Sequence, residues 1–252
     1  MSPSTSTRIP QTDVQTRQKL LTVGIGEPYS RQQRTPYNVC VIDCLVYYVG
    51  VPRPERHPVD KLLDVSRDLV LSHGARAVTV DRIVAASGAP KGSVYHRFST
   101  VNDLLAAMWL RGVRRSQARF LEPLHAGGNP LEAAVAAGLA IHDFAAEEPA
   151  DARLLAALRR EDLVGEVADP ALAVALRQVN DELRSAVTAL ARHLYGRATR
   201  DAIERTTFAV IDLPQGAIRR HLVQGVAVPR GIRPQLAAAI RAALRHPPGS
   251  TD

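Results

Sequence analysis

Hydrophobic positions recur with the period of a helix along the chain from Val59 onward. In the first such segment the apolar side chains are spaced to cover one face of a helix. They are Val59, Leu62, Leu63, Leu69 and Val70. Pro58 stands before this segment and Gly74 after it, and these residue types commonly flank a helix at those two ends. We therefore predict a first helix at about residues 59–72.

The helical period continues to residue 245, and no stretch after residue 58 alternates between polar and apolar residues as a strand does. The further predicted helices are 79–87, 90–97, 100–122, 130–147, 151–160, 170–195, 199–222 and 233–245. The body of the protein is therefore predicted to be all-α. Pro214 lies inside one of these ranges and is expected to kink its helix.

The first 56 residues differ from the rest. Residues 1–38 are rich in Ser, Thr, Gln, Pro and Arg and lack hydrophobic periodicity, which is typical of a disordered extension. Residues 39–51 are largely β-branched and aromatic, and they predict a strand or buried segment because they are too few to span a membrane. Two interpretations stay open: the extension has no role, or it is a basic arm that contacts DNA phosphates. The candidate cations of such an arm are Arg31, Arg34, Arg53 and Arg56.

Charge and cysteine content narrow the chemistry only in part. The net charge of +7 suits a polyanionic partner, but residues 57–106 carry 6 Lys and Arg against 5 Asp and Glu. Any DNA binding must therefore depend on where a few cations lie. Cys40 and Cys44 lack zinc-ligand spacing, so we expect no metal or cofactor, and without a recognisable secretory leader we expect a cytoplasmic location.

Residues 79–98 have the layout of a helix-turn-helix. Thr79 can cap a short helix, with Asp81 near the positive end of the helix dipole. Gly88 can end that helix in a left-handed conformation, and Pro90 fits the start of the next one. Two short helices joined by a three-residue turn that contains Gly define the helix-turn-helix motif.

The second helix of this motif carries polar groups suited to DNA on its outer side. Val94 and Phe98 are expected to face inward. The outward residues are Lys91, Gly92, Tyr95 and His96, and Ser93 adds a hydroxyl. A cation, a phenol, an imidazole and a glycine that lets backbone come close can contact phosphates and base edges. An ordinary surface helix with scattered polar residues stays the alternative.

The segment Val59 to Leu105 resembles the N-terminal domain of the TetR family. Its run KGSVYHRF, residues 91–98, is similar to the family's recognition segment SKGTLYxHF. The resemblance implies a major-groove recognition helix and a homodimer on near-palindromic double-stranded operator DNA. It places Thr79, Lys91, Gly92, Ser93, Tyr95 and His96 on DNA-contacting positions, and the predicted DNA-binding set also includes Arg82, Pro90, Arg97 and Thr100. Two departures are Val101, where the family commonly has Lys, and Pro90, where a Ser cap is usual.

We predict four parts in the chain: the extension 1–56, the DNA-binding domain 57–106, a helical ligand-binding and dimerisation domain 107–246, and a tail 247–252. Residues after 106 contain no recognisable catalytic motif, so an enzyme is not expected. The resemblance implies a small-molecule effector site among residues 106–195. Its candidate residues are Met108, Trp109, Phe120, His142 and Phe144, for which core packing is the alternative role.

The last two helices are expected to pair with a second copy of the chain. The segment 211–222 and a downstream apolar stripe are assigned to this contact on the same resemblance. The stripe consists of Leu236, Ala239, Ile240 and Ala243.

The predicted function is sequence-specific regulation of transcription by a repressor that an effector releases. In this mechanism the effector shifts the predicted helix 100–122, which follows the helix-turn-helix. The shift changes the separation of the two DNA-binding domains in the dimer. One alternative is a helical ligand-binding or enzymatic protein with a vestigial helix-turn-helix. Another is an architectural DNA binder without sequence preference.

Overall fold

The protein is described by a computed structural model over residues 59–164 and 166–245. The predicted extension 1–56, the predicted strand within 39–51 and the tail 247–252 lie outside the described residues.

Every regular element in the described part of the chain is a helix, which confirms the predicted all-α class. The N-terminal elements are α2 (Val59–His73), η2 (Ala75–Ala77), α3 (Val80–Ser87) and α4 (Lys91–Arg97). The middle elements are α5 (Val101–His125), α6 (Pro130–Glu147), α7 (Pro149–Ala157) and α8 (Glu161–Val164). The C-terminal elements are α9 (Pro170–Gln178), α10 (Asp181–Tyr195), α11 (Arg200–Thr207), η3 (Phe208–Asp212), α12 (Leu213–Gln224) and α13 (Ile232–Arg245).

Two long predicted helices are interrupted in the structure. The predicted helix 170–195 divides at Val179 and Asn180 into α9 and α10. The predicted helix 199–222 contains a π-helical segment, η3, which ends directly before Leu213 and Pro214. Because proline lacks an N–H and its ring presses on the carbonyl four residues earlier, a wider helical turn at this place relieves the conflict.

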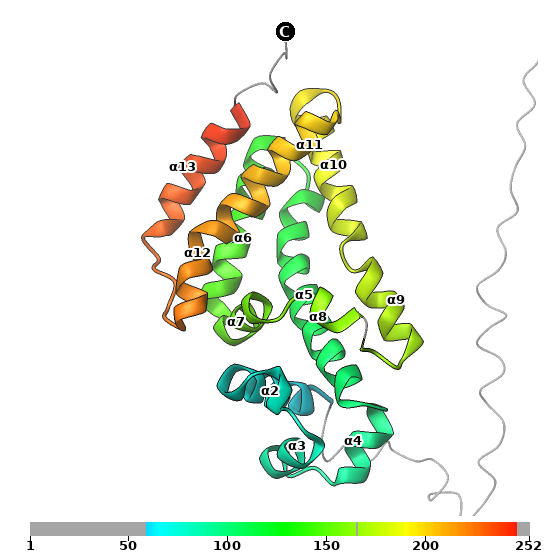
Figure 1. The fold of residues 1–252 in the computed structure, drawn as a ribbon. Helices are drawn as coiled ribbons and strands as arrows, with labels where there is room; N and C mark the ends of the chain where they lie inside the picture. The colour runs from blue at the N-terminus through cyan, green and yellow to red at the C-terminus, as the bar shows by residue number, and fades with distance from the viewer. Residues whose placement is uncertain (1–58, 165, 246–252) are drawn as a thin grey trace, which may run out of the picture. The chain divides into compact units, whose positions relative to one another are not determined.

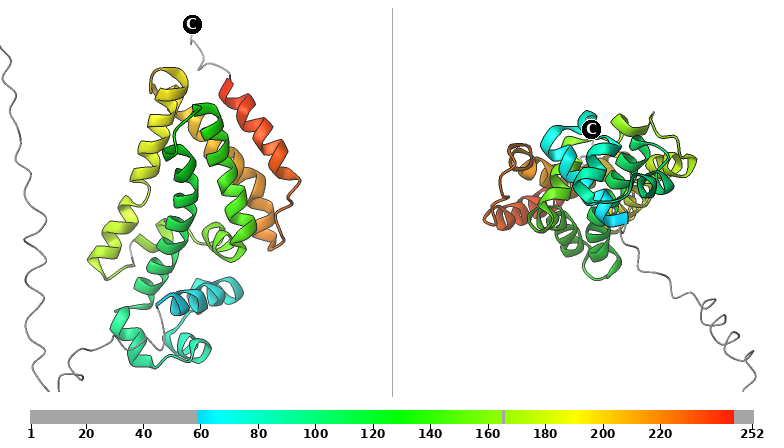
Figure 2. Two further views of the ribbon diagram at one scale, coloured as in Figure 1. Left: turned by 180° about the vertical axis from the view of Figure 1, so that it is seen from behind. Right: turned by 90° about the horizontal axis from the view of Figure 1, so that it is seen from below.

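Helix α5 connects the two ends of the described unit. Figure 1 shows it rising from the group α2–α4 and continuing beside α6 and α10, and the rear view in Figure 2 shows the same order. Its first half shares a hydrophobic core with α2–α4 and α7–α9, including Ile83 and Leu154. Its second half shares a core with α6, α10 and α13, including Phe120 and Ile240. The boundary predicted between residues 106 and 107 therefore falls inside one continuous helix.

Helix α13 packs closely on α6 within the same chain. A Cβ at Gly138 of α6 would lie only 2.6 Å from Cδ1 of Ile240, so the absence of a side chain permits the close approach. Leu236 and Ile240 are 3% and 0% exposed, while Ala239 and Ala243 are half-buried. The two large members of the predicted dimer stripe are thus core residues of one chain, because their period follows the buried face of α13.

A buried carboxylate joins α7 to both α2 and α5. The side chain of Asp151, in the first turn of α7, is 2% exposed. Its Oδ1 accepts a hydrogen bond from Arg67 of α2 at 2.8 Å, and its Oδ2 accepts one from Arg115 of α5 at 3.1 Å. Burial alone would raise the pKa of Asp151, but the bond and charge of Arg67, with help from Arg115 and Arg111, outweigh it and lower that pKa.

A second pair of contacts links α5 to α2. The guanidinium of Arg111 donates to Asp64 at 2.5 Å and to Asp60 at 3.0 Å. The side chain of Arg111 is only 13% exposed. These ion pairs and the Asp151 contacts together hold α2, the first helix of the helix-turn-helix region, against the rest of the unit.

Replacing Asp151 by Asn is expected to lower the free energy of unfolding by about 3 kcal/mol, because Arg67 loses its buried anion. Asp68→Asn is the matched control: Asp68 also binds Arg67, but its side chain is 62% exposed, so its loss is expected to cost below about 1 kcal/mol. Urea denaturation at neutral pH measures both variants. If both variants lose equally little free energy of unfolding, Asp151 is not the buried anion that stabilises the fold.

The effect of Asp151→Asn should also depend on pH. The folded-state pKa of Asp151 is lowered, so its stabilising contribution is present above the unfolded value of about 4 and is lost as pH falls through the folded value. The gap in unfolding free energy between wild type and variant is therefore expected to shrink in acid. A gap that stays constant down to about pH 3 would argue against a charged Asp151 as its cause.

Candidate functional site

Helix α3 begins and ends where the sequence predicts. Thr79 precedes it, and its Oγ1 accepts a hydrogen bond from the backbone N–H of Arg82 at 3.3 Å. Gly88 follows it with φ +70°, in the left-handed region that favours glycine. The chain can therefore reverse direction within a short turn before α4.

The turn between α3 and α4 is held by a residue that the sequence analysis missed. Ser87 is 3% exposed, and its Oγ accepts a hydrogen bond from the backbone N–H of Ala89 at 3.1 Å. Ala89 is itself buried in the core that contains Ile83 and Val94. The local Ser-Gly signal for a side-chain-stabilised turn could have identified this role.

Helix α4 turns one side to the core and the other outward, as predicted. Val94 and Phe98 are 2% and 8% exposed. We define the reading face as the exposed residues of and beside α4, which are Pro90, Lys91, Gly92, Tyr95 and His96. Tyr95 is 52% exposed although it is large and aromatic. The reading face thus offers a cation, a phenol and an imidazole on a helix fixed from behind.

Of the other five predicted DNA-binding residues, Ser93 is half-buried on α4, and the remaining four have side-chain contacts within the fold. Thr79 caps α3 and Thr100 caps α5. Arg82 donates to a carbonyl oxygen of η2 at 3.1 Å, and Arg97 donates to the carbonyl oxygen of Ser93 at 3.4 Å. Their contact with DNA stays a prediction, since these groups already serve the local structure.

Gly92 is not required by the packing of the protein. It lies within α4 and its φ is not positive, and apart from its chain neighbours and the backbone of its own helix no described atom lies within 4 Å of the place a Cβ would take. Glycine in a helix costs about 0.5–1 kcal/mol relative to alanine. A glycine kept on the exposed reading face is therefore suited to close approach of a partner's backbone.

Lys91 is paired in the structure with Asp81 of α3, at 2.8 Å between Nζ and Oδ1. The hydrogen bond to Asp81 and its negative charge raise the pKa of Lys91. The two side chains are 55% and 80% exposed, so water screens this pair and a phosphate can replace the carboxylate. Asp81 thus competes with DNA for a cation of the reading face.

The start of α5 is fixed by Asp103, which the sequence analysis also missed. Thr100 and Asp103 exchange hydrogen bonds with each other's backbone N–H groups, both at 3.0 Å. The other oxygen of Asp103 accepts from the N–H groups of Ala168 and Asp169, directly before α9. Burial would raise the pKa of Asp103, but these hydrogen bonds outweigh it and lower that pKa. The capping-box spacing Thr-x-x-Asp was the available signal.

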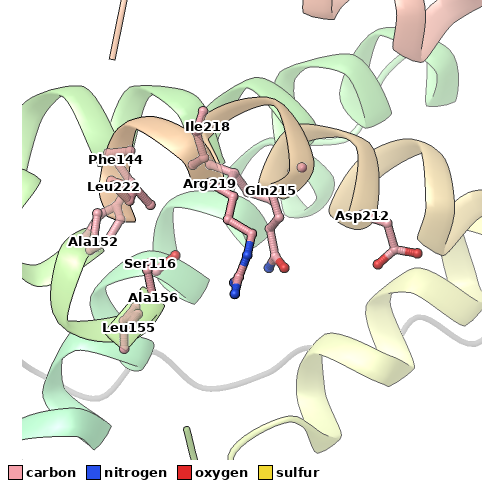
Figure 3. Close-up of a pocket in the computed structure, with 13 residues that line it drawn as sticks. Ser116, Phe144, Ala152, Leu155, Ala156, Asp212, Gln215, Ile218, Arg219 and Leu222 are labelled. Atoms are coloured by element: carbon pink, nitrogen blue, oxygen red, sulfur yellow. The ribbon is translucent and has the colours of Figure 1, made fainter. Parts of the chain in front are cut away.

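Two adjoining cavities lie farther along α5, and we call them together the central cavity. The first, of about 330 Å³, lies between α5, α6, α7 and α12, as Figure 3 shows. The second, of about 370 Å³, extends toward α10. They share Ser116, Ile141, Leu155 and Gln215 in their walls. The size lies in the range of small-molecule sites.

Three of the five predicted effector residues line the central cavity and two do not. Phe144 lines the first cavity, and Trp109 and Phe120 line the second. Met108 lines neither, because it is buried in the core shared with α2–α4. The cavity also reaches beyond the predicted range 106–195, since α12 contributes polar residues such as Arg219. No sequence signal distinguished these polar residues of α12 from ordinary surface residues of a helix.

His142, the remaining predicted effector residue, lies outside the central cavity. Its ring is buried, with Nε2 3.3 Å from the carbonyl oxygen of Pro229 and Nδ1 3.1 Å from Asp143. Within residues 59–164 and 166–245, no three His, Cys, Asp or Glu side chains gather as a metal-binding group. Among the described helices, none combines the length and apolar character needed to cross a membrane.

Comparisons with known proteins agree with this geometry. Residues 62–108 match the sequence profile of the family described as "Bacterial regulatory proteins, tetR family". A search of curated proteins finds no match to the sequence.

Solved structures share the fold at low sequence identity. A putative transcriptional regulator from Pseudomonas aeruginosa PAO1 is 18% identical, covers 77% of this chain and 91% of its own, and has a TM-score of 0.60. The ketosteroid transcriptional regulator KstR2 of Mycobacterium tuberculosis is 18% identical, with 77% and 97% covered and a TM-score of 0.57. A transcriptional regulator from Rhodococcus sp. Rha1 is 21% identical, with 74% and 93% covered and a TM-score of 0.55.

A helix-turn-helix with an exposed second helix, set on an all-α body, defines a DNA-binding regulator of transcription. The profile match then identifies residues 62–108 as a DNA-binding domain of the kind found in the tetR family of bacterial regulatory proteins. The resemblance seen in the sequence is thereby confirmed.

Replacing Gly92 by Ala is expected to stabilise the fold by about 0.5–1 kcal/mol and to weaken DNA binding, because a methyl group then occupies the reading face. Ser185→Ala on α10 is the control, since this exposed helical residue lies outside the reading face and outside the lining of the central cavity, and alanine has the higher helix propensity. It should stabilise to a similar degree and leave DNA affinity unchanged. Thermal unfolding and fluorescence anisotropy measure the two effects. Unchanged DNA affinity in Gly92→Ala would exclude close approach at this point.

Replacing Asp81 by Asn is expected to strengthen DNA binding a few-fold, because Lys91 loses its competing carboxylate and the domain loses a negative charge. Glu182→Gln on α10 removes the same charge away from the reading face and serves as control. Anisotropy titrations over a range of salt concentrations measure the change. If both variants gain equally, the effect comes from net charge and not from the release of Lys91.

Proposed function

We propose that this regulator is a repressor which binds operator DNA as a homodimer in the bacterial cytoplasm and is released by a small molecule in the central cavity. The observation that supports this most is the course of α5. Its first turn, capped by Thr100, comes directly after α4, which carries the reading face. Farther along α5, Ser116 and Phe120 line the cavity. One rigid element thus connects the two sites.

Helix α7 provides a second route between cavity and reading face. Leu155 and Ala156 of α7 line the first cavity, while Asp151 at its start binds Arg67 of α2. A ligand that displaces α7 therefore acts on the buried ion pair and through it on the helix-turn-helix. A ligand changes DNA affinity only as far as it binds the two arrangements of α7 unequally.

The second copy is expected on the exposed side of α12 and α13. Val223 of α12 is 67% exposed although it is apolar, Ala238 and Ala242 of α13 are exposed as well, and Phe208 of η3, which leads into α12, is 53% exposed. A two-fold arrangement of helix-turn-helix units places their recognition helices in successive major grooves about 34 Å apart. Dimerisation then doubles the contacts of a reading face that carries few charges.

The proposal is tested with the full chain and the intergenic DNA upstream of its own gene. The double variant Lys91→Ala, Tyr95→Phe should lose about tenfold or more of its affinity for this DNA, since both side chains lie on the reading face. Its melting temperature and dimer state should not change, because both residues are exposed. Lys61→Ala, an exposed lysine of α2, is the control for loss of one positive charge.

Unrelated DNA of equal length separates this proposal from its alternatives. Equal affinity for both DNAs, with a steep salt dependence, would favour an architectural DNA binder. Absence of DNA binding in a protein that still binds small molecules would favour a ligand-binding or enzymatic protein with a vestigial motif.

A further inference from the structure

The polar groups of the first cavity project mainly from α12. Figure 3 shows the side chains of Arg219 and Gln215 extending next to each other from α12 into the open space. Ser116 of α5 adds a hydroxyl to the same cavity wall. Asp212, which also lines the cavity, is the last residue of η3, before α12, and lies away from Arg219 in this view. The guanidinium and the amide are therefore the donors best placed for one ligand group.

The guanidinium of Arg219 is not engaged by the protein. No hydrogen bond or ion pair joins it to another residue in the described part of the chain. In the second cavity, Arg160 binds Glu161, whereas Arg159 shares with Arg219 the lack of an ion-pair partner among the described residues. Arg219 is the only arginine in the described lining of the first cavity. A planar guanidinium that faces a cavity without a carboxylate partner is suited to binding an anion from solution.

The rest of the cavity wall is apolar. Phe144 and Ile218 are 3% and 4% exposed, and Leu155 and Leu222 are half-buried beside them. A ligand held at Arg219 would cover these side chains with its body, and removal of apolar surface from water favours binding. The second cavity continues the space toward Trp109, so the site has room for an extended body.

From this arrangement we propose that the central cavity takes a small organic anion, a carboxylate head on an apolar body. Arg219 binds the carboxylate, Gln215 donates a further hydrogen bond from its amide, and the body lies against Phe144 and Ile218. The inference rests on the proposed function in treating the cavity as the effector site. It adds the chemical class of the effector and the residue that selects it.

The test compares acids with neutral molecules of the same shape. Octanoate and 2-naphthoate, each with its primary amide, are titrated into the full chain by calorimetry. Each acid should bind about tenfold more tightly than its amide, because a charge-assisted hydrogen bond to Arg219 is available only to the acid. Arg219→Gln should weaken acid binding about tenfold and leave amide binding unchanged. Arg219→Lys should keep part of the preference.

Arg220→Gln is the matched control, because this neighbouring arginine of α12 does not line the cavity. It should leave both affinities as in the wild type. Equal binding of acids and amides, binding of neither, or an acid preference that survives Arg219→Gln would each overturn the inference. An acid preference that depends on Arg219 without any release of DNA would support it and would instead contradict effector release.

Discussion

The described structure depends on one buried carboxylate. Asp151 lies between Arg67 and Arg115, so that three helices from distant parts of the sequence, α2, α5 and α7, share one charged contact. A buried anion stabilises the fold only while its cations stay in place, and the loss of either partner is costly. The position of α2, and with it that of the helix-turn-helix, is therefore tied to the position of α7 on the cavity wall.

Under the proposed function, this constraint provides a way to control a nearly neutral DNA-binding domain. The reading face has few cations, and Lys91 is already shared with Asp81. For the proposed homodimer, affinity for DNA is therefore expected to depend on the placement of two reading faces and not on a large excess of charge. Under the proposed release mechanism, a small shift of α7 or α5 is expected to alter DNA binding, because these helices share a closely packed core with α2–α4.

The local features of the site could be predicted from sequence, and the long-range ones could not. Thr79, Gly88 and Val94 follow capping and period rules that involve only their neighbours in the chain. The bond from Arg67 to Asp151 joins residues 84 positions apart, and Asp151 in the sequence is simply an acid in the first turn of a helix.

Two further features could not be predicted because they also depend on contacts between residues distant in the sequence. The period of Leu236 and Ile240 gives a buried face but does not say whether this chain or a second copy buries it; α6 does so. In the sequence, Arg219 has the pattern of a solvated surface residue; only the fold places it in the wall of a cavity.

The central claim is that Asp151 ties the position of the helix-turn-helix to that of α7. Its most direct measurement is hydrogen–deuterium exchange of the full chain carrying Asp151→Asn, compared with Asp68→Asn. The account predicts faster exchange in α7 and also in α3 and α4 for the first variant alone, whereas faster exchange confined to α7 would contradict it.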